Sequence, residues 1–149
     1  MTDGDMTFRE LDIVRVFDAP RELVFRAWTD PHQLTRWWGP TGFSTQSVAL
    51  EVTPGGAWRT CIRSGEDGRD YWSYGHYTEV VPPERLVLTF RWEDEDSPET
   101  LVTVSFEDQG GKTRMTFRQA LFGTVEERDD HESGWSECFD DLAAMLAER

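Results

Sequence analysis

Apolar and polar side chains alternate with a period of two over a long stretch of the chain, residues 43–121, and this pattern leaves few possible folds. Such alternation is typical of β-strands that bury one face. Turn signals rich in glycine and proline divide the stretch at Pro54 to Gly56, Asp67-Gly68, Val81 to Pro83 and Gln109 to Gly111. Short turns between alternating runs predict a meander of antiparallel strands.

The same alternation assigns inward faces to most of these strands. The side chains expected to point inward are Trp58, Thr60 and Ile62, then Leu86, Leu88, Phe90 and Trp92, then Val102, Val104 and Phe106, and finally Met115, Phe117 and Gln119. Cys61 falls on the outer face. The strand from Asp70 to Val80 has aromatic residues in both parities, so its inner face stays unassigned, and Gly75 is interpreted as a bulge.

The last segment carries a helical stripe instead. Its apolar residues recur at the spacing of one helix face and are Trp135, Cys138, Phe139, Leu142, Met145 and Leu146. This pattern predicts a long C-terminal helix. The acidic residues 126–130 would complement the positive end of the helix dipole if the helix starts that early, whereas Gly134 would interrupt it and move the start later.

The segment before the meander predicts one strand and two short helices. The strand runs from Phe8 to Phe17, and a helix follows from Pro20, because proline is tolerated in a first helical turn. A break at Thr29 to Pro31 starts a second short helix, which Gly39-Pro40 ends. The expected order is therefore a strand, two short helices, a meander and a long helix.

That order, together with local sequence, resembles the START-like (SRPBCC, helix-grip) superfamily. The segments FDAPRELVFRAWTDPHQLTRWWGPTGF (17–43), PGGAWR (54–59), YGHYTEVVPPERLVLTF (74–90) and Gly134-Trp135 are similar to the bacterial family named after the activator of the heat-shock-protein ATPase. The resemblance implies an α+β helix-grip fold, in which a curved antiparallel sheet of about seven strands wraps around the C-terminal helix. It implies a single START-like domain over residues 1–149, with its core at about 8–147.

The net charge and the cysteines limit which partners and which cellular compartment can be expected. The formal net charge is −14, from 29 acidic and 15 basic residues. Nucleic acids and anionic membrane surfaces are therefore not expected as partners, because both draw affinity from Lys and Arg. The two cysteines show no CxxC spacing, the N-terminus is acidic where a signal peptide is basic, and no apolar run could span a bilayer. We expect a cytoplasmic protein with reduced thiols.

Motifs for common chemistries are missing from the sequence. Three histidines lie far apart without metal-ligand spacing, and neither a phosphate-binding loop nor GxSxG occurs. We therefore expect no metal and no cofactor, and we assign no catalytic residue. General acid–base work by a carboxylate on a strand, with Glu51, Glu79 and Glu10 as the candidates, stays open as an alternative, although none of them has a partner in the sequence.

Aromatic residues make up 13% of the chain, more than a compact domain of this size needs for its core. Aromatic walls with a few fixed polar groups are typical of small-molecule sites. The residues expected to bind a ligand are Trp38, Phe43, Trp58, Tyr74, His76, Tyr77, Phe90, Trp92, Met115, Phe117, Gln119, Trp135 and Phe139. We expect the amide of Gln119, which lies in line with two apolar neighbours, to serve the ligand.

These expectations lead to one favoured function and two alternatives. The favoured function is binding of a hydrophobic small molecule between the sheet and the C-terminal helix, without catalysis or with weak catalysis. The first alternative is an enzyme of the cyclase, lyase or hydrolase type in the same cavity, which a perturbed inward carboxylate or histidine would favour. The second is a co-chaperone-like protein-interaction module, which a large exposed apolar patch would favour. A homodimer stays open.

Overall fold

The protein was analysed as a computed structural model that describes residues 9–94 and 96–148. Its elements are β1 (Leu11–Phe17), α2 (Arg21–Thr29), α3 (Pro31–Trp37), β2 (Phe43–Leu50), β3 (Ala57–Ser64), β4 (Asp70–Val81), β5 (Arg85–Trp92), β6 (Thr100–Gln109), β7 (Lys112–Ala120) and α4 (Val125–Leu146). The expected order of elements is confirmed. The proposed start of the first strand at Phe8 lies outside the described residues.

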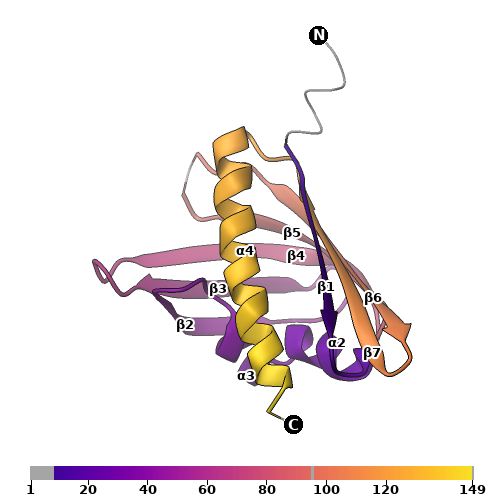
Figure 1. The fold of residues 1–149 in the computed structure, drawn as a ribbon. Coiled ribbons are helices and arrows are strands. Elements are labelled where there is room, and N and C mark those ends of the chain that lie inside the picture. The colour runs from indigo at the N-terminus through magenta and orange to yellow at the C-terminus, as the bar shows by residue number, and fades with distance from the viewer. Residues whose placement is uncertain (1–8, 95, 149) are drawn as a thin grey trace.

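The seven strands form one antiparallel sheet in the order β1-β7-β6-β5-β4-β3-β2. Only β1 departs from the meander, because it pairs with β7 at one edge. The sheet curls, and α4 lies across its concave side, with α2 and α3 near the C-terminal end of that helix (Figure 1). Arg15 of β1 ties the sheet edge to α4, since its guanidinium donates to Asp140 and to the Ser136 carbonyl. The α+β helix-grip architecture expected from the sequence is thus the fold.

Capping residues fix where the helices begin. In α3, Pro31 occupies the first turn and the Asp30 carboxylate accepts from the backbone N–H of His32. In α4, the Thr124 hydroxyl accepts from the backbone N–H of Glu127 and donates to the Glu127 carboxylate, so Thr124 is the N-cap of this helix. This cap starts α4 early, and the helix runs through Gly134 without a break.

In strand β4 the structure shows which side chains face inward, a question that the sequence left open. Tyr71, Ser73 and Tyr77 point inward: Ser73 shares a hydrogen bond with Thr60 of β3, and Tyr77 lies in the core. The irregularity in its pairing with β5 lies between Tyr77 and Glu79, so the bulge expected at Gly75 is wrongly placed. Gly75 instead permits a close approach, since a Cβ there would lie 2.0 Å from the Thr89 carbonyl oxygen.

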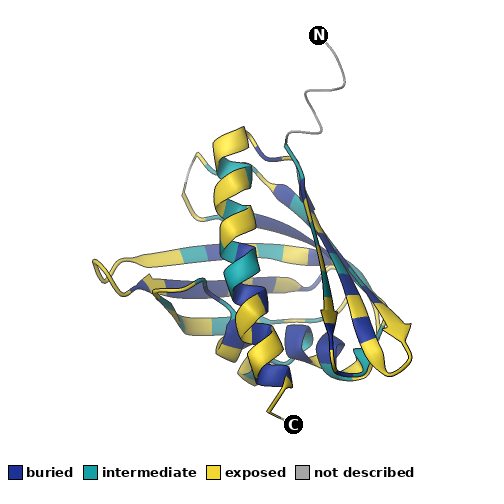
Figure 2. Cartoon of the chain, in the orientation of Figure 1, coloured by how far each residue is buried: buried dark blue, intermediate teal, exposed yellow. Residues whose placement is uncertain are grey.

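The core lies between the concave face of the sheet and the helices (Figure 2). The inward-facing residues expected on β6 and β7 are buried there, and the α4 stripe packs against them. Cys61 requires a correction. It has the outer parity of Arg59 and Arg63, yet only 1% of it is exposed. Its short side chain lies opposite Trp72 in the pairing with β4, so neighbouring large side chains cover it.

Candidate ligand-binding pocket

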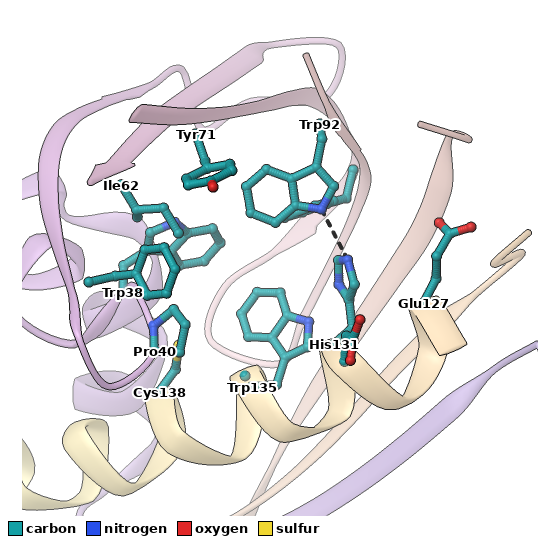
Figure 3. Close-up of a pocket in the computed structure, with 14 residues that line it drawn as sticks. Trp38, Pro40, Ile62, Tyr71, Trp92, Glu127, His131, Trp135 and Cys138 are labelled. Carbon is teal, nitrogen blue, oxygen red and sulfur yellow. Dashed lines mark hydrogen bonds between the residues drawn. The ribbon is translucent and has the colours of Figure 1, made fainter. Parts of the chain in front are cut away.

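A cavity of about 350 Å³ lies between α4 and the sheet and is partly open to solvent. Figure 3 shows the aromatic and aliphatic side chains around a shared space, with Glu127 set apart beyond Trp92 and His131. Its lining residues are Trp38, Gly39, Pro40, Phe43, Ile62, Tyr71, Phe90, Trp92, Glu127, Asp130, His131, Gly134, Trp135 and Cys138. Most of this surface is apolar. Its volume falls in the range of about 300–1,000 Å³ that is usual for small-molecule sites.

Helix α4 forms one side of the cavity. Its lining residues recur every three or four positions, which is the spacing of one helix face, and are Glu127, Asp130, His131, Gly134, Trp135 and Cys138. The face carries carboxylates at its N-terminal end and apolar groups towards its C-terminal end. Gly134 leaves room in the middle, because a Cβ there would meet only Pro40, at 3.9 Å.

The opposite walls come from the segment after α3 and from β2 to β5. The chain turns at Gly39, which has a φ of 97°, and this turn places Trp38 and Pro40 over the cavity. Ile62 and Tyr71 come from paired positions of β3 and β4. The alternation of β5 then brings Phe90 and Trp92 to the same side of the sheet.

A hydrogen-bonded chain of side chains runs from the cavity wall into the core. The Trp92 indole N–H donates to His131 Nε2 at 3.1 Å, and His131 Nδ1 lies 3.1 Å from Gln119 Oε1. The Trp135 indole N–H donates to the same Gln119 oxygen at 2.8 Å. Gln119 Nε2 donates in turn to the Thr100 hydroxyl at 2.8 Å. The chain therefore links the wall of the cavity to β5, β6, β7 and α4.

These contacts fix the protonation pattern of His131. An indole nitrogen can only donate, so Trp92 requires an unprotonated Nε2 and Trp135 requires the oxygen of Gln119 at its end. His131 therefore carries its proton on Nδ1 and donates it to Gln119 Oε1. A second proton on Nε2 would break the hydrogen bond from Trp92.

Burial shifts the pKa values of His131 and Cys138, and for His131 the shift favours the neutral form that the hydrogen bonds require. Burial lowers the pKa of His131 to about 4, while the Asp130 carboxylate acts in the opposite direction. Burial raises the pKa of the Cys138 thiol to about 12. At neutral pH the cavity therefore contains a neutral imidazole and a protonated thiol.

The structure divides the sequence-predicted ligand set into three groups. Trp38, Phe43, Phe90, Trp92 and Trp135 line the cavity. A second group is buried in the core and does not line it, namely Trp58, Tyr77, Met115, Phe117, Gln119 and Phe139. Tyr74 and His76 are exposed, and Tyr74 instead borders a shallower hollow beside Arg59 and Glu93.

Gln119 corrects a further expectation. Its side chain is fully buried, with 0% exposed, and both ends of its amide have hydrogen-bond partners within the protein. The amide therefore has a structural role and does not face the cavity. It influences the cavity only through His131 and Trp135, which do line it.

Several lining residues are absent from the ligand set predicted from the sequence, among them Tyr71, Glu127, Asp130 and His131. For His131, only a metal-binding role is considered from the sequence. The stripe of α4, followed backwards from Trp135 by one turn, reaches His131, and by two turns it reaches Glu127. That signal was present in the sequence, whereas Tyr71 was hidden by the mixed parity of β4.

Two other kinds of site find no support. Within residues 9–94 and 96–148, no group of three or more His, Cys, Asp or Glu side chains could hold a metal ion. No helix in the described part of the chain combines the length and apolarity needed to cross a membrane.

Comparisons with known proteins agree with this architecture. The profile of the family described as Activator of Hsp90 ATPase homolog 1-like protein matches residues 18–147. A protein from Chromobacterium violaceum has a TM-score of 0.88 at 27% identity, covering 93% of this chain and 96% of its own. An AHSA1 protein from Silicibacter pomeroyi has a TM-score of 0.83 at 31% identity, covering 93% of this chain and 97% of its own. A protein from Arthrobacter aurescens has a TM-score of 0.81 at 28% identity, covering 100% and 92%. Among curated proteins, none matches the chain.

Proposed function

The chain belongs to the family of Activator of Hsp90 ATPase homolog 1-like proteins, and we propose that it binds a hydrophobic small molecule in the cavity between α4 and the sheet. Proteins with this START-like fold commonly bind hydrophobic ligands. The fold alone does not assign a function, because one scaffold supports many. The proposal therefore rests on the cavity of this chain.

The observation that carries the proposal is the composition of the cavity wall. Aromatic and aliphatic side chains from β2, β3, β4, β5 and α4 supply most of it, around a volume of about 350 Å³. Burying an apolar molecule there removes apolar surface of both partners from water, at about 25 cal/mol per Å². The polar groups of the lining are few, and its carboxylates and imidazole lie at one end, while the Tyr71 hydroxyl and the Cys138 thiol lie elsewhere; a few fixed polar groups in an apolar wall orient a bound ligand.

N-phenyl-1-naphthylamine, a neutral apolar fluorophore, provides the test. We expect saturable binding at one site, seen as increased probe emission. Gly134→Leu should weaken this binding at least about tenfold, because the new side chain projects into the cavity. Ala144→Leu is the matched control, since it adds the same side chain at an exposed position of α4. Equal binding by both variants, or the lack of saturable binding, would contradict the proposal.

An enzyme in the same cavity is the second candidate, and His131 favours it. This histidine is inward and has a lowered pKa, which is a common property of functional sites. However, a base with a pKa of about 4 is weak at neutral pH, and its Nδ1 partner is the neutral Gln119 amide rather than a carboxylate. The binding function is therefore preferred.

A protein-interaction module has less support. The large hydrophobic residues that are exposed among those described are spread over several elements: Val14 and Val16 of β1, Tyr71, Tyr74 and Val81 of β4, Leu121 in the connection after β7, and Val125 of α4. Because three strands separate β1 from β4 in the sheet, these residues do not form one continuous patch. Both cysteines are free, which suits the reducing cytoplasm proposed for the protein.

A further inference from the structure

We propose that the ligand of this cavity is an apolar molecule carrying a protonated amine, bound with its ammonium group beside Glu127 and Asp130 and its apolar body against Trp38 and Trp135. This inference rests on the proposed function and names the class of ligand. The orientation follows from the distribution of polar groups along α4, from the hydrogen-bond donors already in use and from the local charge.

The cavity is polarised along α4. Glu127 and Asp130 line its N-terminal end, whereas Gly134, Trp135 and Cys138 line the other end. These residues span about 16 Å along the helix, at 1.5 Å per residue. Figure 3 shows Glu127 on the far side of Trp92 and Trp135 from Ile62 and Trp38. A ligand that is apolar at one end and polar at the other would match this distribution.

The polar end offers acceptors, because the nearby donors are in use. The indole N–H groups of Trp38, Trp92 and Trp135 donate to Thr60, His131 and Gln119 respectively. The carboxylates of Glu127 and Asp130 can only accept when ionised, whereas the single lone pair of His131 Nε2 is already occupied by the Trp92 indole N–H. A ligand group in this place must therefore supply the donors, and an ammonium supplies three.

The charges of the residues that line the cavity also favour a cationic ligand. Among the residues that line the cavity, none is Lys or Arg, and two are acidic. The start of a helix carries only about half a positive charge, which the two full negative charges outweigh. Arg128, the nearest cation along α4, is paired with Asp129. An anionic ligand would meet like charges and a neutral histidine at this end.

Aromatic faces beside the carboxylates also favour a cation. The rings of Phe90 and Trp92 lie 5.5 and 5.9 Å from that of His131, measured between centroids. A cation held near His131 therefore lies within reach of two aromatic rings, whose faces attract positive charge. Aromatic walls with carboxylates at one end are suited to an apolar amine more than to an alcohol or an acid.

The experiment compares three probes that share one ring system by calorimetric titration at pH 7. These are 1-naphthylmethylammonium, 1-naphthalenemethanol and 1-naphthoate. We expect the ammonium to bind about tenfold more tightly than the alcohol, and the naphthoate to bind most weakly. Glu127→Gln with Asp130→Asn should reduce the ammonium affinity to about that of the alcohol, and it should lower the alcohol affinity much less, because the alcohol carries no charge.

The matched control is Glu126→Gln with Glu132→Gln. It removes the same number of charges from the same helix at positions that do not line the cavity, and it should preserve the preference for the ammonium. In the test variant, Glu127→Gln introduces a side chain that also suits the third position of a capping box, so the start of α4 stays intact.

The possible failures separate the two proposals. If the ammonium and the alcohol bind equally well, and Gly134→Leu abolishes both, the ligand class is wrong while the cavity function stands. If the test variant and the control variant lose the preference for the ammonium to the same extent, this preference reflects the net charge of the protein. That result would overturn the assignment to Glu127 and Asp130. If neither these probes nor N-phenyl-1-naphthylamine binds in a manner sensitive to Gly134→Leu, the cavity function itself is wrong.

Discussion

Among single residues, Gln119 and His131 set the polar character of an otherwise apolar site. The Gln119 oxygen accepts from two side chains of α4, and its nitrogen donates to Thr100 at the start of β6. If the amide were lost, the buried Trp135 indole N–H would have no acceptor, whereas the Thr100 hydroxyl would keep its bond to the Phe90 carbonyl and His131 its bond from Trp92. A fully satisfied buried network stabilises one arrangement, whereas a broken one is costly.

Gln119→Leu should therefore destabilise the protein. The substitution leaves the buried Trp135 indole N–H without an acceptor, which costs about 1–3 kcal/mol, and it also removes the hydrogen bonds of Gln119 with Thr100 and His131. Urea unfolding should show a loss of at least about 2 kcal/mol, against about 0.5 kcal/mol or less for Gln109→Leu at an exposed position. Equal losses in the two variants would mean that the amide contributes nothing to the core.

His131 should make stability depend on pH. Its pKa falls from 6.5 to about 4 on folding, so the unfolded chain binds the proton first as the pH drops. The contribution is fully present above about pH 6.5 and is lost progressively towards pH 4, by up to about 3 kcal/mol. The unfolding free energies of the wild type and of His131→Gln should be measured from pH 7.5 to 4. The difference between the two proteins should change by about that amount over this range. Parallel curves would show that His131 titrates alike in both states.

Among the secondary-structure elements, α4 carries both the core stripe and the cavity face. Gly134 lowers the stability of this helix, because a glycine loses more backbone conformational entropy on folding than other residues do. Close packing does not require glycine here, since the atoms nearest to an added Cβ would belong to Pro40, at 3.9 Å. Its value is the room it leaves in the cavity.

Gly134→Ala should accordingly stabilise the protein by about 0.5–1 kcal/mol, the helix propensity difference between the two residues. Gly75→Ala in β4 is the opposite case, because its Cβ would lie 2.0 Å from the Thr89 carbonyl oxygen. That variant should lose stability. Thermal or urea unfolding distinguishes the two, and a loss of stability in Gly134→Ala would show that the helix needs glycine there.

For the molecule as a whole, charge limits the partners. A net charge of −14 repels polyanions at long range, and half of the 14 described basic residues form ion pairs with carboxylates, namely Arg15, Arg36, Arg59, Arg63, Arg85, Arg118 and Arg128. Binding to nucleic acid draws on free cations that release counterions. The same charge attracts cationic small molecules.

We therefore expect no measurable binding to DNA or RNA at physiological salt. Electrophoretic mobility shifts with duplex and single-stranded probes, at about 10 μM protein, should show no complex. A complex that weakens as salt is raised would contradict this expectation, because it would reveal cationic contacts that the charge distribution does not suggest.

The elements and most of the core can be predicted from the sequence alone. Period-two alternation, turn residues and one helical stripe are local consequences of backbone geometry, so they can be recognised without knowing the tertiary structure. The buried faces of β6, β7 and α4 follow from them, as do cavity residues such as Phe90 and Trp135. The resemblance to a known family then predicts how the elements are arranged.

The roles of the polar residues, by contrast, depend on the tertiary structure. The environment of Gln119 comes from β6 and α4, and that of His131 from β5 and β7, at sequence separations of up to 39 residues. Parity places Cys61 on the outer face, but its burial depends on large neighbours from the adjoining strand. A local pattern gives the direction of a side chain, whereas its solvation, partners and pKa depend on what the fold brings next to it.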